Sequence, residues 1–184
     1  MYRLLLVDDE QGIVSALKRV LMNIPSQELD GEPVVIEGFT SAKEALTRAS
    51  SMAFDLVIAD YRMPEMSGVE FLSKLIKIQP QVQRLILSAY ADINAVIAAV
   101  NEVQIFRFIN KPWHDFELKS AVTQALASRA LLLENQRLAD RLRVQEGKLS
   151  RHEAELRRLE EESPGITKLK RSEDGGIILD EDDY

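Results

Sequence analysis

The stretch Leu56-Val57-Ile58-Ala59-Asp60 sets four apolar residues without a break in front of a single carboxylate. A short continuous apolar run of this kind is typical of a strand that is covered on both faces. Such a strand delivers its last side chain to the carboxyl edge of a parallel sheet, where open α/β folds keep their sites. We therefore predict that Asp60 is held at that edge and that the rest of the chain is built around it.

Further β-prone runs lie on both sides of this strand, and helical patterns separate them. The predicted strands cover residues 4–7, 34–36, 84–88 and 105–109. The segments between them carry apolar residues at helical spacing, including one at 93–100 with Asp92 as its N-cap. Strands that alternate with helices predict right-handed βαβ units. We therefore expect an α/β fold with a five-stranded parallel sheet in a domain spanning residues 1–128.

Polar side chains follow four of the predicted strands. They are Asp8 and Asp9, Asp60, Ser88 and Lys111. Because the carboxyl ends of parallel strands meet at one edge of a sheet, we expect these side chains to lie close together. Three carboxylates repel one another unless a cation lies among them, and Mg²⁺ is the hard, oxygen-liganded ion that fits best.

The chemistry that this set of residues favours is acceptance of a phosphoryl group. A carboxylate beside Mg²⁺ can attack phosphorus and form an aspartyl phosphate, which makes Asp60 the candidate nucleophile. Asp8 and Asp9 would hold the metal, the Lys111 ammonium would neutralise phosphoryl oxygens, and the Ser88 hydroxyl would hydrogen-bond one of them. Each residue alone is as readily a turn, cap or surface residue, so the hypothesis depends on their occurring together.

Several motifs in this order resemble the receiver domain of two-component response regulators. They are VDDE (7–10), DYRMPEMSG (60–68), LSA (87–89) and KP (111–112), and the resemblance covers about the first two-thirds of the chain. It implies a doubly wound, flavodoxin-like sheet in the order 2-1-3-4-5. It also implies phosphotransfer to Asp60 from a sensor histidine kinase or a phosphotransfer protein, the backbone carbonyl of Arg62 as a further metal ligand, and Ser88 with Phe108 as switch residues.

The chain beyond Asp115 is rich in Leu, Ala, Glu and Arg and has only Gly147 as a helix-weakening residue before Pro164. This composition predicts a long helix. Beyond the receiver segment a heptad places positions a at 135, 142, 149 and 156, and positions d at 131, 138, 145, 152 and 159. We therefore predict a coiled coil over 129–162, continuous with the last receiver helix.

Charges beside this heptad favour a parallel homodimer. In a parallel pair Arg141 faces Glu146 of the second copy and Lys148 faces Glu153, whereas an antiparallel pair sets glutamates against one another. Asn135 at an a position is a residue that fixes register in two-stranded coils. The alternative is a single exposed helix that packs on another protein.

The last predicted segment, residues 163–184, is an acidic tail. Ser163-Pro164-Gly165 ends the helix, and two β-prone runs around Asp174-Gly175 suggest a small hairpin. A docking motif and a solubilising tail are equally compatible with it.

Composition excludes several other classes. The chain has no Cys, which removes disulfides and thiolate chemistry, and its net charge of −7 disfavours non-specific nucleic-acid binding. The first residues enter a short strand directly, so we expect no signal peptide, no membrane contact and a cytoplasmic location. No DNA-binding or enzymatic pattern follows the receiver segment, so we expect no DNA partner and an unknown downstream protein.

Two rival hypotheses stay open. The first is a phosphorylation-independent dimeric adaptor or scaffold. The second is a phosphatase that uses an aspartyl-phosphate intermediate, similar to haloacid-dehalogenase-like enzymes. That family has a general-acid Asp two residues after the nucleophile, where this chain has Arg62. We therefore expect a phosphoacceptor that is not an enzyme beyond dephosphorylating itself.

Overall fold

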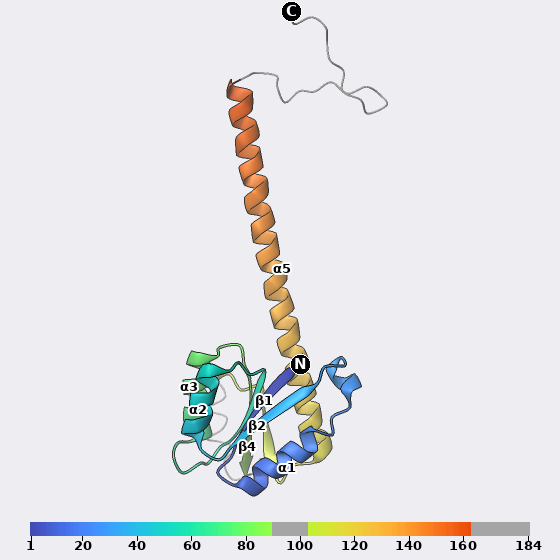
Figure 1. Cartoon of the computed structure of the whole chain (residues 1–184), viewed down its shortest axis with the longest axis vertical. Helices are drawn as coiled ribbons and strands as arrows, with labels where there is room; N and C mark the ends of the chain where they lie inside the picture. The colour runs from blue at the N-terminus through green and yellow to red at the C-terminus, as the bar shows by residue number, and fades with distance from the viewer. Residues whose placement is uncertain (90–102, 163–184) are drawn as a thin grey trace, which may run out of the picture. The chain divides into compact units, whose positions relative to one another are not determined.

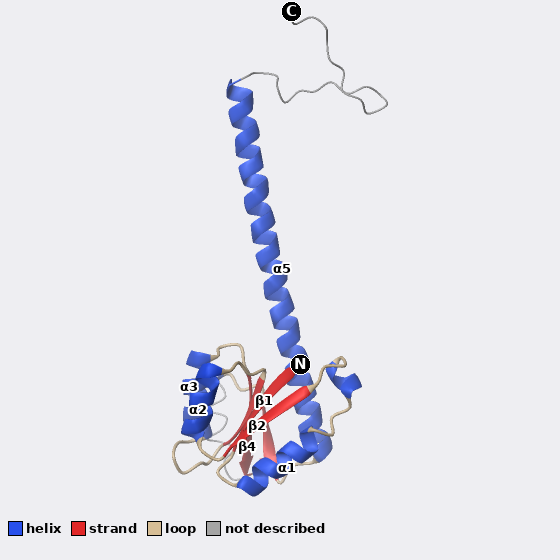
Figure 2. Ribbon diagram, viewed as in Figure 1, coloured by secondary structure: helices blue, strands red, loops and turns tan. Residues whose placement is uncertain are grey.

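One five-stranded parallel sheet forms the centre of the fold in the computed structural model, which describes residues 1–89 and 103–162 (Figures 1 and 2). The strand order is β2-β1-β3-β4-β5, which confirms the predicted flavodoxin-like sheet. The strands are β1 (Tyr2–Val7), β2 (Val34–Phe39), β3 (Leu56–Asp60), β4 (Gln83–Ala89) and β5 (Arg107–Lys111). In the register of the central pair, Asp60 at the end of β3 lies opposite Leu87.

The helices alternate with these strands, as the sequence predicts. They are α1 (Gln11–Leu21), the short 3-10 helix η1 (Ser26–Leu29), α2 (Ala42–Ser51), α3 (Gly68–Ile78) and α5 (Asp115–Glu162). The helix predicted at 93–100 and the tail hairpin predicted within 163–184 lie outside the described residues. No described helix combines the length and the apolar character that crossing a membrane requires.

Alternation of side chains along the strands creates two cores, one on each face of the sheet. Leu4 and Leu6 point to the core shared with α1 and α5, and Leu5 and Val7 point to the core shared with α2 and α3. Figure 2 shows the red strands between these two helical layers. Because both faces are covered, β3 is buried at every position, as its unbroken apolar sequence predicts.

Two glycines allow close approach between elements. A Cβ at Gly68, the first residue of α3, would overlap the carbonyl oxygen of Asp60. A Cβ at Gly38 in β2 would overlap the Cγ1 methyl of Val14 in α1. The chain can therefore bring α3 against the end of β3, and α1 against β2, only because these two positions lack a side chain.

The contacts divide the chain into two units, Met1–Leu133 and Glu134–Tyr184, and α5 contributes to both. In the first unit the helix packs on the sheet through an apolar face. This face consists of Leu118, Ala121, Val122, Ala125 and Leu126.

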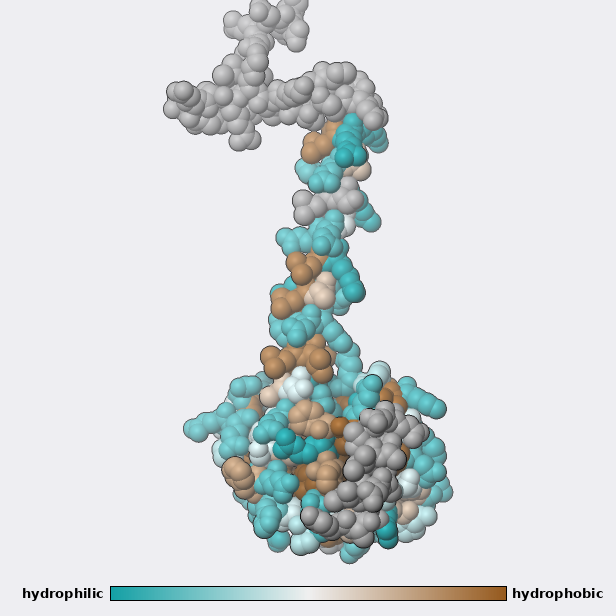
Figure 3. Space-filling view, turned by 180° about the vertical axis from the view of Figure 1, so that it is seen from behind, coloured by the Kyte–Doolittle hydropathy of each residue, from teal (hydrophilic) through white to brown (hydrophobic). Residues whose placement is uncertain are grey.

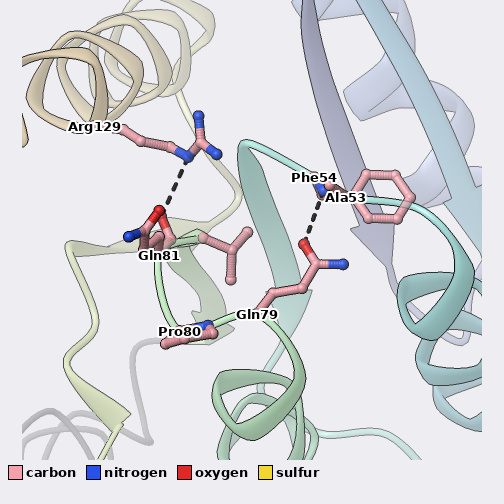
Figure 4. Close-up of a pocket in the computed structure, with 7 residues that line it drawn as sticks. Ala53, Phe54, Gln79, Pro80, Gln81 and Arg129 are labelled. Carbon is pink, nitrogen blue, oxygen red and sulfur yellow. Dashed lines mark hydrogen bonds between the residues drawn. The ribbon is translucent and has the colours of Figure 1, made fainter. Parts of the chain in front are cut away.

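Arg129 anchors this part of α5 at the amino edge of the sheet. Its Nε donates to the carbonyl oxygen of Gln81 at 3.2 Å (Figure 4), and its guanidinium pairs with the Asp55 carboxylate. The other oxygen of Asp55 accepts a hydrogen bond from the backbone N–H of Arg3 at 2.7 Å. Asp55 therefore links β1 and the start of β3 to α5.

Candidate functional site

Three polar side chains meet at the carboxyl edge of the sheet because they extend one face of three strands. Asp8 follows β1, Asp60 ends β3 and Lys111 ends β5. The residue two positions before each of them belongs to the core that packs on α1 and α5. Since side chains alternate with a period of two, all three are directed to the same side of the sheet.

The Lys111 ammonium lies between the two carboxylates. Its Nζ is 2.6 Å from Asp8 Oδ2 and 2.5 Å from Asp60 Oδ1. Asp8 is fully buried and Asp60 is 6% exposed, so these charge-assisted hydrogen bonds form away from bulk water. Backbone N–H groups hold the remaining oxygens: Arg62 donates to Asp60 Oδ2 at 2.8 Å and Glu10 donates to Asp8 Oδ1 at 3.0 Å.

Burial and pairing act against each other on the charges of this site. Burial raises the pKa of Asp8, although the hydrogen bond from Lys111 opposes that shift. Burial also disfavours the charged form of Lys111, but hydrogen bonds to Asp60 and Asp8 outweigh it and the pKa of the ammonium is raised. Lys111 is therefore a fixed positive charge at neutral pH.

The other predicted site residues are placed differently. Asp9 is exposed to solvent, and Phe108 on β5 is half-buried. Ser88 is buried, but its position two residues after Ile86 assigns it to the core of the opposite face. Its hydroxyl donates to the carbonyl oxygen of Ala89 at 3.2 Å. The roles predicted for these three residues stay predictions.

The oxygen donors at this edge fit Mg²⁺. Among residues 1–89 and 103–162 no group of three or more His, Cys, Asp or Glu side chains is placed to hold a metal ion. Asp8 and Asp60 nevertheless converge, since both carboxylates contact the same ammonium. Mg²⁺ typically binds through one or two carboxylates and completes its coordination shell with water and phosphate oxygens. The two carboxylates of Asp8 and Asp60 are therefore a sufficient set of protein ligands for it.

One contact beside the site has no counterpart in the sequence patterns. Glu65, in the loop after Asp60, accepts hydrogen bonds from the Ser41 hydroxyl at 3.0 Å and from the Lys43 N–H at 3.4 Å. These partners are 24 and 22 residues away. Local spacing cannot reveal such a pair, because only the packing of two loops brings it together.

Comparison with known proteins agrees with this geometry. The sequence profile of the response regulator receiver domain matches residues 4–123. The chain belongs to this family. Its receiver is thus the part that contains the sheet and the cluster of Asp8, Asp60 and Lys111.

Individual relatives show the same likeness. The hydrogenase transcriptional regulatory protein HoxA of Cupriavidus necator is 34% identical over 140 residues, which are 76% of this chain and 27% of HoxA. The C4-dicarboxylate transport transcriptional regulatory protein DctD of Rhizobium meliloti is 29% identical over 133 residues, 72% of this chain and 27% of DctD. The chain thus spans about a quarter of the length of these two regulators.

A solved structure extends the comparison to three dimensions. The signal receiver domain of an HD domain-containing protein from Pseudomonas fluorescens Pf-5 superimposes with a TM-score of 0.61 at 31% identity. The match covers 72% of this chain and 92% of that domain. Because that domain is nearly all covered, the likeness concerns the receiver.

Proposed function

We propose that this chain is a phospho-accepting response regulator of a two-component phosphorelay. A sensor histidine kinase or phosphotransfer protein would phosphorylate it on Asp60. The observation that carries the proposal is the Asp60 carboxylate, buried at the sheet edge with one oxygen on the Lys111 ammonium and the other on the Arg62 N–H. The proposed kinase partner also implies a cytoplasmic location.

The cluster of Asp8, Asp60 and Lys111 would perform the transfer as follows. An oxygen of Asp60 attacks phosphorus and forms a P–O bond while the P–N bond to the donor histidine breaks. Lys111, whose charge is fixed by its two carboxylate partners, then pairs with a phosphoryl oxygen. Mg²⁺ would be held by Asp8, Asp9, Asp60 and the carbonyl of Arg62, and would neutralise phosphoryl charge.

Two further residues would respond to the phosphoryl group. Ser88, which the alternation along β4 assigns to the opposite face, would turn toward the site and exchange its hydrogen bond to Ala89 for one to a phosphoryl oxygen. Phe108, which lacks a hydroxyl, would report the change by ring packing alone. The receiver would accept a phosphoryl group and could dephosphorylate itself, without acting on other substrates.

Intact mass tests the acceptor. We expect one added phosphate on the wild-type chain after incubation with Mg²⁺ and a small acyl-phosphate donor, and none on Asp60→Asn. A mutant that is phosphorylated as fully as the wild type would contradict Asp60 as the acceptor. A wild-type chain that takes up no phosphate would favour the adaptor hypothesis.

We further propose that the output is a parallel homodimer through a coiled coil over 129–162, between a receiver at 1–128 and a tail at 163–184. The exposed apolar side chains of α5 support this. Four of them fall on predicted a or d positions: Leu131, Leu138, Leu142 and Leu156. Figure 3 shows apolar side chains recurring along the helix among hydrophilic ones. Leu132 and Val144 are exposed off this seam.

The partner of this surface follows from its chemistry. A second copy supplies both the leucines for the seam and the charges that complement its flanks, with Arg141 facing Glu146 and Lys148 facing Glu153. The dimer would act on a downstream protein, without contacts to DNA or membrane. The alternative is an adaptor that dimerises through the same exposed leucines independently of phosphate.

Light scattering with and without phosphoryl donor separates these alternatives. A phosphorelay output predicts that the dimer dissociation constant changes on phosphorylation of the wild type and stays constant for Asp60→Asn. The adaptor predicts equal dimerisation of both chains under both conditions.

A further inference from the structure

Backbone hydrogen bonds close both ends of the loop between β3 and α3. At its start the Arg62 N–H donates to Asp60 Oδ2 at 2.8 Å. At its end the N–H of Gly68 donates to the carbonyl oxygen of Tyr61 at 2.9 Å. Met66 is 9% exposed and enters the core that packs on α2 and α3. Met63 is partly buried and packs against the same core. These contacts hold the loop from its buried side.

Glu65 holds the same loop from its exposed side. Its Oε2 accepts hydrogen bonds from the Ser41 hydroxyl and the Lys43 N–H, at the start of α2. Ser41 is the N-cap of that helix, where backbone N–H groups have no partner within the helix and favour negative charge. An exposed glutamate usually keeps its rotamer freedom. Here the carboxylate gives up that freedom to join two loops.

We propose that Glu65 is a positioning residue of the phosphoacceptor loop. By tying the loop to the start of α2, Glu65 holds the backbone of Arg62, three residues earlier, in the place where the Arg62 carbonyl would bind Mg²⁺. This inference rests on the proposed function, because it concerns the metal site of that reaction. Glu65 itself would contact neither the metal nor the phosphoryl group.

Two effects of Glu65 need separation, because its charge also attracts a cation at a distance. Glu65→Gln keeps an oxygen that accepts from Ser41 and Lys43 but removes the charge. Glu65→Ala removes both. Glu44→Ala is the matched control: it removes an exposed carboxylate from the first turn of the same helix, and only the backbone N–H of Glu44 takes part in the cap.

The experiment is a Mg²⁺ titration of the full chain. Fluorescence of Trp113 follows binding, since it is the only tryptophan and lines a cavity with Lys111. Titration calorimetry measures the same dissociation constant independently. We expect Glu65→Ala to weaken Mg²⁺ binding about 3- to 10-fold, at or below the lower end for residues that orient metal ligands. Glu65→Gln and Glu44→Ala should stay within about twofold of the wild type.

A second readout separates positioning from general stability. Phosphorylation of Glu65→Ala by a small acyl phosphate should need more Mg²⁺ yet reach the wild-type rate at saturation. Ser41→Ala should weaken Mg²⁺ binding too. The double variant Ser41→Ala/Glu65→Ala should bind Mg²⁺ almost as well as Glu65→Ala alone, because the two substitutions remove the same hydrogen bond.

Three results would overturn the inference. The first is a Mg²⁺ affinity of Glu65→Ala equal to that of the wild type. The second is an equal loss in Glu65→Ala, Glu65→Gln and Glu44→Ala, which would mean that charge alone acts. The third is a wild-type chain that binds no Mg²⁺, which would overturn the proposed metal site together with this inference.

Discussion

Gly68 allows α3 to begin close to the backbone of the acceptor Asp60, because it has no side chain. A Cβ at this position would overlap the carbonyl oxygen of Asp60, which is backbone and cannot rotate away. Gly68→Ala should therefore lower the free energy of unfolding by about 1–3 kcal/mol and reduce phosphorylation, measured by denaturant titration and intact mass.

Gly147→Ala is the control for this prediction, because nothing lies within 4 Å of the position where its Cβ would be. It should stabilise the helix by up to about 1 kcal/mol. A Gly68→Ala chain with wild-type stability and phosphorylation would contradict the steric argument.

Glu37 gives a prediction for pH. Its two carboxylate oxygens accept from Arg48 at 2.7 and 2.9 Å, and these hydrogen bonds lower the pKa of Glu37. A depressed pKa adds stability above the unfolded value of about 4.3, and this stability is lost as the pH falls through the folded value. At neutral pH the free energy of unfolding of the wild type should be about 1 kcal/mol higher than that of Glu37→Gln.

The same comparison at low pH is the check. In denaturant titrations near pH 3 the difference in the free energy of unfolding between wild type and Glu37→Gln should shrink, because this pH lies below the unfolded pKa of about 4.3 and protonation then favours the unfolded chain. A difference that stays constant between the two pH values would show that the ion pair does not contribute.

The convergence of Asp8, Asp60 and Lys111 could be predicted because each follows a strand that the sequence marks clearly. The directions of Asp9 and Ser88 could not. Side-chain direction at a strand end depends on where the pleat ends and the loop begins, and the sequence locates that point only to within a residue or two. Their roles, like those of the converging residues, stay proposals to be tested by the experiments above.

At the scale of elements, β5 shows what an apolar run does and does not reveal. The run predicts a strand at 105–109, whereas the strand is Arg107–Lys111. Ile105 is buried although it precedes the strand, and Phe106 donates to the carbonyl oxygen of Arg84 just before the regular ladder. Apolar sequence reports burial, and only the partner strand determines where pairing begins.

The Arg129 anchor predicts how α5 is held. Arg129→Gln removes a guanidinium whose side chain is 18% exposed and leaves Asp55 without its cation. We expect the free energy of unfolding of the receiver to fall by about 2 kcal/mol, measured by denaturant titration.

Arg137→Gln is the matched control on the same helix. Its pair with Glu134 is exposed and spans 3.8 Å, so its loss should change stability by less than about 0.5 kcal/mol. Equal effects of the two substitutions would show that the Arg129 contacts add nothing beyond a surface pair.

At the scale of the whole molecule, we expect the first unit to fold and accept phosphate by itself, and the second unit to be needed for dimerisation. Met1–Leu133 contains both cores and the cluster of Asp8, Asp60 and Lys111. We expect a chain ending at Leu133 to fold, to accept phosphate on Asp60 and to stay monomeric by light scattering, while the full chain dimerises. A truncated chain that dimerises as tightly as the full chain would assign the dimer contact to the receiver.

The contact between Gly38 and Val14 also constrains how this sequence can change over generations. An alanine at position 38 is disfavoured while valine occupies position 14, because its methyl would overlap the Val14 side chain and force it to shift. A lineage would replace Gly38 by alanine at least cost after position 14 had become smaller, and that intermediate would carry a cavity beside β2. One order of the two substitutions is thereby favoured, and the two positions should vary together among descendants rather than independently.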